Sequence, residues 1–199
     1  MDYSKLRFQG IERLARSINP GTWAVESERP LSTLLGSCVA VCLVDSQTRI
    51  GGLNHFMLPN LRRNGNAPLD ALLFGSHAME ALLDALLQRG ARKERLQAKA
   101  FGGGTIIDSG GESPSIGLRN AEFAKEWLAR QGIPLLAADF LGPWSRKVLF
   151  LPITGEVFCR RLVTSMATAE VIAREEASYA AKLISAAKFS APLLSCSDA

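Results

Sequence analysis

The segment GSCVAVCLVDSQTRIGGLNHFML, residues 36–58, carries the pattern that decides the fold. Apolar residues alternate with small ones over 39–43, which predicts a mostly buried strand. Residues 49–58 predict a second strand, and the Asp-Ser-Gln-Thr sequence at 45–48 has the chemistry of a turn. The segment therefore predicts an antiparallel hairpin.

This hairpin brings a cysteine to a histidine. A turn centred between Ser46 and Gln47 places Cys38 directly opposite His55, with Cβ atoms about 5 Å apart on one face. A register shift of one residue would put the two side chains on opposite faces. A neighbouring imidazolium can lower the pKa of a thiol to roughly 3.5–7.5. We therefore take Cys38 as a candidate nucleophile and His55 as its general base and acid.

Small and polar residues before the cysteine support this hypothesis. Gly36 and Ser37 predict a close backbone approach that presents amide N–H groups to an oxyanion. A third side chain must orient the imidazole ring, and the nearby hydroxyls of Ser32 and Thr33 are candidates. The alternative is that Cys38 is a small buried hydrophobic residue, as most cysteines are.

The four cysteines are Cys38, Cys42, Cys159 and Cys196. They include no CxxC pair, and we do not expect a disulfide framework in a cytosolic chain of this size. Cys42 shares the strand face of Cys38 and is predicted to belong to the core. A metal site of Cys38, Cys42 and His55 has three candidate ligands and lacks a clear fourth. We expect no metal and no cofactor.

Composition limits the class of protein. The chain has 199 residues, of which 47% are hydrophobic and 21% charged, as in one globular domain. No run of 18 apolar residues predicts a membrane span, and the N-terminus lacks an apolar leader, which predicts a cytoplasmic protein. Residues 89–99 are rich in Arg and Lys, but no aromatic residues accompany them, so a solvated turn is favoured over a nucleic-acid site.

Strands and helices alternate along the rest of the chain. They predict an α+β fold, a layered sandwich of mixed β-sheets flanked by helices. The glycine run 102–104 lacks the spacing of a phosphate-binding loop and predicts a tight turn. Further strands are expected at 96–100, 133–140, 148–151 and 156–163, and helices at 68–88, at 120–131 with Asn120 as the N-cap, and at 167–188.

Several motifs in the same order resemble the CheD family of chemoreceptor glutamine deamidases; they lie at 34–43, 51–59, 98–103, 116–120 and 132–139. The resemblance implies a cysteine-deamidase-like fold and hydrolysis of receptor glutamine side chains to glutamate, with release of ammonia. It places the family's nucleophile on Cys38 and its general base on His55. The family's third residue is a threonine six positions before the cysteine. That position is Ser32 here, and Thr33 follows it.

The resemblance also suggests a division of the chain. It covers residues 23–163, expected to be the deamidase domain after an N-terminal extension at 1–22, while composition predicts an extra helix at 164–189 and a disordered tail at 190–199. The extra helix is expected to pack on the domain, with docking on a partner as the alternative.

The expected partners are methyl-accepting chemoreceptors as substrate and a CheC-type phosphatase, with no nucleic acid and no membrane insertion. Two alternatives to the deamidase remain. One is a non-catalytic regulatory module that docks on the phosphatase or on receptors. The other is a cysteine hydrolase of a different acyl bond, such as a receptor methyl ester.

Overall fold

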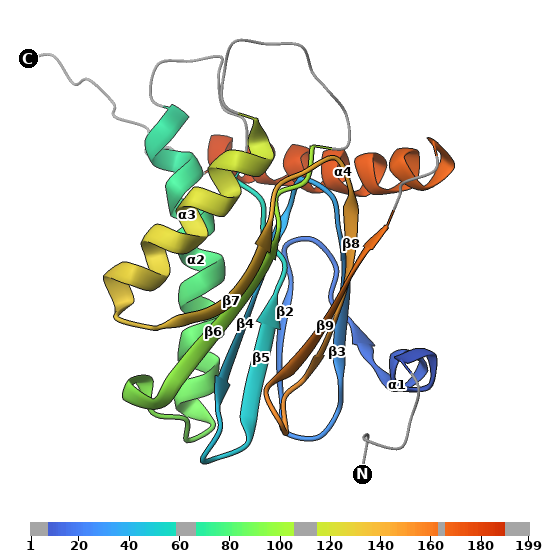
Figure 1. Cartoon of the computed structure of the whole chain (residues 1–199). Helices are drawn as coiled ribbons and strands as arrows, with labels where there is room; N and C mark the ends of the chain where they lie inside the picture. The colour runs from blue at the N-terminus through green and yellow to red at the C-terminus, as the bar shows by residue number, and fades with distance from the viewer. Residues whose placement is uncertain (1–7, 59–66, 106–114, 163–165, 190–199) are drawn as a thin grey trace, which may run out of the picture.

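Two β-sheets and a pair of helices are stacked in layers (Figure 1). The computed structural model describes residues 8–58, 67–105, 115–162 and 166–189. The first sheet has five strands, in the spatial order β2 (Trp23–Glu26), β5 (Ile50–Asn54), β4 (Val39–Asp45), β6 (Leu96–Gly102) and β7 (Leu135–Phe140). The second has four, in the order β1 (Arg16–Ser17), β3 (Leu31–Leu35), β8 (Ser145–Leu151) and β9 (Glu156–Leu162).

Each sheet contains one parallel pair among antiparallel ones, β6 with β7 and β1 with β3. Helices α2 (Ala67–Gln88) and α3 (Ile116–Gln131) cover the outer face of the five-stranded sheet (Figure 1). The α+β sandwich of mixed sheets flanked by helices, predicted from the sequence, is confirmed. None of the described helices is both long enough and apolar enough to cross a bilayer.

Strand β4 is central, and every one of its residues is buried. Val39, Val41 and Leu43 point toward the helices and join the core formed with α2 and α3. Ala40 and Cys42 point the other way, into the core between the two sheets. Because both faces are covered, the strand needs apolar or small residues at 39–44, as its sequence indicated, and only Asp45 at its end is charged.

The β4–β5 turn differs from the predicted one. Asp45 pairs with Ile50, so the turn is centred between Gln47 and Thr48, one residue later than expected. The Asp45 carboxylate accepts hydrogen bonds from the backbone N–H groups of Gln47 at 3.0 Å and Thr48 at 3.3 Å, which stabilises a four-residue loop. Arg49 completes the loop in the left-handed region, with φ of 55°.

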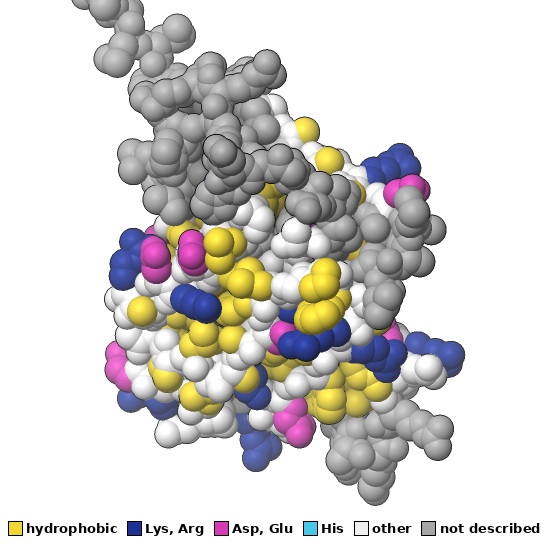
Figure 2. All heavy atoms as spheres, turned by 45° about the horizontal axis from the view of Figure 1, so that its top comes forward, with side chains coloured by type: hydrophobic (Ala, Val, Ile, Leu, Met, Phe, Trp, Pro, Cys, Tyr) yellow, Lys and Arg dark blue, Asp and Glu magenta, His cyan; other side chains and the backbone are white. Residues whose placement is uncertain are grey.

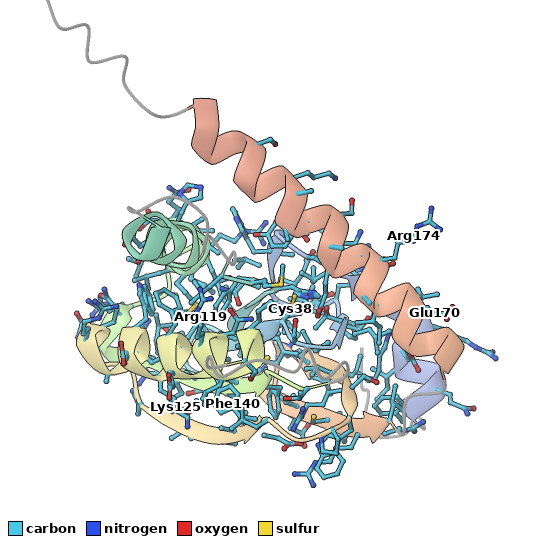
Figure 3. All side chains as sticks on the ribbon, turned by 90° about the horizontal axis from the view of Figure 1, so that it is seen from above. Cys38, Arg119, Lys125, Phe140, Glu170 and Arg174 are labelled. Carbon is cyan, nitrogen blue, oxygen red and sulfur yellow. The ribbon has the colours of Figure 1, made fainter. Side chains whose placement is uncertain are left out.

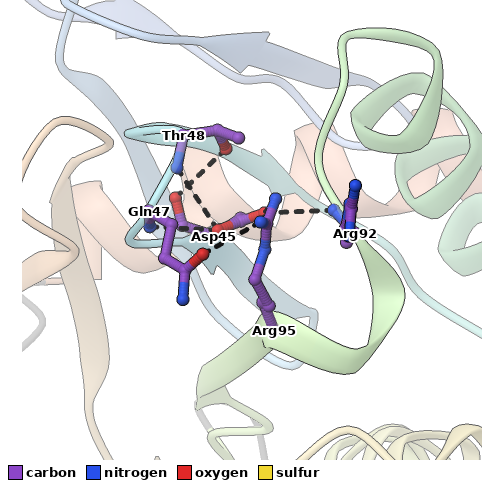
Figure 4. Close-up of polar contacts among 5 residues, drawn as sticks. All are labelled: Asp45, Gln47, Thr48, Arg92 and Arg95. Atoms are coloured by element: carbon purple, nitrogen blue, oxygen red, sulfur yellow. Dashed lines mark hydrogen bonds and ion pairs between the residues drawn. The ribbon is translucent and has the colours of Figure 1, made fainter.

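The basic segment 89–99 is engaged within the fold. Arg95 forms a 2.6 Å ion pair with the buried Asp45, and the Arg92 backbone N–H donates to the same carboxylate (Figure 4). Burial alone would raise the pKa of Asp45, but these hydrogen bonds outweigh it and lower the pKa. Arg92 and Arg95 thus stabilise the β4–β5 hairpin. This agrees with a structural role, and not a nucleic-acid site, for these two residues of the basic segment.

Two expectations about helices and strands are corrected. Helix α3 begins at Ile116, capped by the Ser115 hydroxyl, which accepts from the Leu118 N–H at 3.2 Å. Asn120 is therefore inside the helix and not its N-cap. Residues before Leu31, for which no element was predicted, form α1 (Phe8–Leu14), β1 and β2. Strand β1 has only two residues, too few for a periodic pattern to be recognised.

The expected C-terminal helix is present as α4 (Met166–Phe189), which lies across the end of the sheets where β4 begins (Figure 1). Ile172 is buried, and Glu176 and Tyr179 are partly buried on the same helix face. Packing of the helix on the domain is thus confirmed for this face. The tail predicted to be disordered, 190–199, lies outside the described residues.

Candidate active site

Cys38 lies in the loop between β3 and β4, and its side chain is fully buried, with 0% exposed. The glycine run holds this loop. Gly104 N–H donates to the Gly36 carbonyl at 2.7 Å, and Gly103 N–H donates to the Cys38 carbonyl at 2.8 Å. Gly102 has φ of 122°, and a Cβ there would overlap the Cys38 carbonyl oxygen. The predicted tight turn is therefore also the support on which Cys38 rests.

Asn120 is a second anchor, supplied by α3. Its side chain is fully buried, and its amide group donates to the Ser37 carbonyl at 2.8 Å. Its Oδ1 accepts from the Leu58 N–H at 2.7 Å. Asn120 thus joins the loop before Cys38 to the segment that follows His55. Sequence reasoning missed this role because it placed Asn120 at a helix end.

His55 follows directly after β5, and only 2% of the residue is exposed. Its backbone N–H donates to the Thr22 carbonyl at 3.0 Å. Its Nδ1 lies 2.8 Å from Thr33 Oγ1, which itself donates to the Ile18 carbonyl at 2.7 Å. The space-filling view that brings the α4 end forward shows no histidine among the described atoms of that face (Figure 2).

These contacts fix the tautomer of the His55 ring. The Thr33 hydroxyl has one proton, and the Ile18 carbonyl takes it, so the hydroxyl accepts from His55 Nδ1–H. The Ile18 carbonyl, 3.5 Å from Nδ1, also favours a proton on that nitrogen. Nε2 then carries a free lone pair, and it has no hydrogen-bond partner among the described residues. Such a nitrogen can accept a proton from a thiol.

Thr33 and Ser32 lie on opposite faces of β3. Thr33 pairs with Val148, which belongs to the core between the sheets. Ser32 pairs with Leu149, which packs in a separate cluster on the outer face of the four-stranded sheet. Directly paired residues share a face, so Ser32 points away from His55. The structure therefore brings the hydroxyl of Thr33, and not that of Ser32, to the imidazole.

Cys38 and His55 are not directly opposite, and the predicted register is corrected here. Val39 pairs with Phe56, which puts His55 opposite Ala40. Cys38 and Ala40 share a face because they are two residues apart, so Cys38 and His55 are diagonal neighbours in the layer between the sheets. A register change of two residues preserves the face, and diagonal neighbours are typically about 7–8 Å apart, within reach of long side chains.

A carboxylate from α4 occupies the space next to the thiol. Glu176 Oε1 accepts from the Cys38 backbone N–H at 3.0 Å, and Oε2 accepts from the Ser37 hydroxyl at 2.6 Å. The charge of the same carboxylate also acts on the Cys38 thiol. The Ser37 hydroxyl and the Cys38 amide thus both donate to one carboxylate, and their support of an oxyanion stays a prediction.

The electrostatics of the site differ from the expected ion pair. Burial, and then the charge and hydrogen bond of Glu176, raise the pKa of the Cys38 thiol well above its ordinary value. Burial lowers the pKa of His55 to about 4, although the hydrogen bond with the Ile18 carbonyl opposes this shift. In this conformation both groups are neutral near pH 7, and no imidazolium activates the thiol.

Cys42 and His77 lie outside this arrangement. Cys42 is buried in the core between the sheets, as predicted, and burial raises the pKa of its thiol. His77 is exposed on α2. Among the described residues no group of His, Cys, Asp or Glu side chains could hold a metal ion.

The fold and site define an α+β sandwich protein with a buried cysteine and a threonine-bound histidine in the layer between its sheets. Residues 57–161 match the family model described as CheD chemotactic sensory transduction. This match begins after His55, but the alignments with individual relatives are longer and include both Cys38 and His55. A protein of Dechloromonas aromatica named "Probable chemoreceptor glutamine deamidase CheD 2" is 77% identical over 180 residues, covering 90% of this chain and 91% of that protein. The chain belongs to the CheD family.

Other relatives are more distant. A CheD 2 protein of Burkholderia thailandensis with the same name is 43% identical over 83% of this chain and 85% of that protein. A CheD protein of Xanthomonas campestris is 42% identical over 89% of this chain and 86% of that protein. Among solved structures, the Neisseria meningitidis protein NMB0706 aligns with 68% of this chain and 65% of that chain, with a TM-score of 0.41 and 11% identity.

Proposed function

We propose that this protein is a chemoreceptor glutamine deamidase that converts glutamine side chains of methyl-accepting receptors to glutamate and releases ammonia. The observation that carries the proposal is the threonine-bound imidazole, whose free Nε2 lies in the same layer as the Cys38 thiol. The names of relatives that align with most of the chain support the same activity and substrate.

The first half of the reaction forms a thioester. His55 Nε2 takes the proton of the Cys38 thiol as the sulfur attacks the carboxamide carbon. The Cys38 backbone N–H and the Ser37 hydroxyl, which hold a carboxylate in the structure, stabilise the oxyanion. The imidazolium then gives its proton to the leaving nitrogen, and ammonia departs.

The second half returns the enzyme to its starting state. Neutral His55 takes a proton from water, and the hydroxide oxygen attacks the thioester carbon. The carbon–sulfur bond breaks, the sulfur regains the proton from the imidazolium, and glutamate is released. A neutral histidine suits this step, since a base must be unprotonated, and the low pKa of His55 keeps it so.

The site residues are assigned as follows. Cys38 is the nucleophile, His55 the general base and acid, and Thr33 the residue that positions the ring. Gly36 and Ser37 support the oxyanion, while Ser32 faces away and is assigned no role. Action on receptor cytoplasmic segments implies a cytoplasmic enzyme, and docking of a CheC-type phosphatase stays a prediction from the family resemblance.

The test is deamidation of a purified receptor cytoplasmic fragment, followed by mass spectrometry and by ammonia release. We expect Cys38→Ala to abolish both, and His55→Ala to lower the rate by about 10²–10⁴-fold. Cys42→Ala is the matched control, because Cys42 is buried in the same core between the sheets, whereas the hydrogen bond to Glu176 comes from Cys38. Undiminished deamidation by Cys38→Ala would refute Cys38 as the nucleophile, and absence of deamidation by the wild-type protein would leave a non-catalytic module as the better description.

A further inference from the structure

Helix α4, near the C-terminal end of the sequence, packs against the candidate site with one of its faces. Ile172, Glu176 and Tyr179 are four and three residues apart, so they share that face. The Tyr179 ring lies against Gly21, where a Cβ would overlap the ring atoms. Apolar contacts therefore flank Glu176 on both sides, while Glu170 and Arg174 point away from the domain (Figure 3).

Glu176 contacts the groups that the proposed reaction uses. Its carboxylate accepts from the Cys38 amide and the Ser37 hydroxyl, and its charge acts on the Cys38 thiol; these are the groups assigned above to the reacting carboxamide. A glutamate side chain is also what glutamine deamidation leaves in the site. Hydrogen bonds between ionised and neutral groups are among the stronger ones, so this occupancy competes with an incoming side chain.

We propose that α4 is an autoinhibitory segment, in which Glu176 occupies the site as an intramolecular mimic of the glutamate product. The proposal rests on the proposed function, because a product mimic presupposes that reaction. A receptor glutamine and α4 then compete for the same donors, and the enzyme acts only when α4 has moved away.

The burial and the protonation of Cys38 agree with autoinhibition by α4. With α4 in place, Cys38 is 0% exposed, and the Glu176 charge opposes formation of a thiolate. Displacement of the helix uncovers the loop and removes that charge in one movement. The same contact therefore blocks entry of the substrate and keeps the sulfur in its unreactive form.

The first experiment tests whether the protein deamidates its own residue 176. In the full-length Glu176→Gln variant, a carboxamide replaces the carboxylate beside the thiol. Attack by Cys38, loss of ammonia and hydrolysis of the thioester restore glutamate at this position. We expect the intact mass to return to that of the wild-type chain, with one ammonia released per molecule and a rate independent of protein concentration.

Two control variants accompany it. Glu175→Gln places the same carboxamide on an exposed position of the same helix and should remain unchanged. The double variant Cys38→Ala/Glu176→Gln should also keep its mass. Conversion of Glu175→Gln at the same rate as Glu176→Gln would show that docking in the site is not required, and it would overturn the proposal.

The second experiment measures closure of the site without any catalysis. Iodoacetamide labelling of Cys38, located by tandem mass spectrometry, should be faster in Glu176→Ala than in Glu175→Ala by about tenfold, the effect of one hydrogen bond to a charged group. The kcat/KM for a receptor fragment should rise by a similar factor.

The outcomes separate the two proposals. Equal labelling rates in the two variants would overturn autoinhibition, whatever the protein catalyses. Faster labelling in Glu176→Ala without deamidation of the receptor fragment, or of the chain itself in Glu176→Gln, would support closure by α4 and overturn the deamidase function.

Discussion

The role of the Thr33 hydroxyl in orienting His55 can be tested by replacing that hydroxyl with a methyl group. Thr33→Val keeps the shape of the side chain but removes the hydroxyl that joins His55 Nδ1 to the Ile18 carbonyl. These two groups are already 3.5 Å apart, so a small rotation of the ring lets them bond directly. The loss of stability should therefore be modest, about 1–3 kcal/mol, as for one imperfectly satisfied buried polar group.

The effect on catalysis should be larger than the effect on stability. Rotation of the ring toward Ile18 turns Nε2 away from the position in which it takes the thiol proton. We expect kcat for receptor deamidation to fall by about 10² or more, within the range of about 10²–10⁴ that general acid–base catalysis contributes. KM should change little, because Thr33 is not assigned a contact with the substrate.

The assay combines kinetics of ammonia release with thermal unfolding. Thr33→Ser retains the hydroxyl and should recover most of kcat, whereas Ser32→Ala should behave as wild type because Ser32 faces the outer side of its sheet. The reasoning is refuted by an unchanged kcat in Thr33→Val, or by a loss in Ser32→Ala as large as that in Thr33→Val.

Three further predictions concern the supports of the site. Asn120→Ala leaves one buried and one partly buried backbone group unpaired, and at about 1–3 kcal/mol for a buried group urea unfolding should detect a loss of about 2 kcal/mol. Gly102→Ala should destabilise the protein and lower kcat, because the new Cβ would overlap the Cys38 carbonyl oxygen. Gly90→Ala is the control: it is also at positive φ, but no atom lies within 4 Å of the new Cβ, so the free energy of unfolding should fall by only about 1–2 kcal/mol and kcat should not change. The unfolded chain protonates His55 near pH 6.5 and the folded chain near 4, so stability should fall by roughly 2 kcal/mol from pH 7 to pH 5. A His55→Leu variant that shows the same fall in urea unfolding contradicts this assignment.

The sequence by itself determined the layered fold and most of its elements. The alternation at 39–43 is confirmed as a strand buried on both faces, and the helix ended by Gly132 is confirmed by the left-handed conformation of that residue. These features depend on local periodicity and on the conformations that single residues prefer, so they can be predicted without knowledge of contacts. The family was also recognisable, because its motifs are short and contiguous.

The tertiary structure decided the register and the composition of the site. The side chain of Asp45 stabilises a longer turn, which makes Cys38 and His55 diagonal neighbours. Thr33 contacts the ring because pairing with β8 turns its side chain inward. Glu176 lies more than a hundred positions from Cys38 in the chain, and no local pattern marks it. Contacts of this kind arise when separate layers pack together, and a periodic sequence pattern holds no information about which layer a side chain will meet.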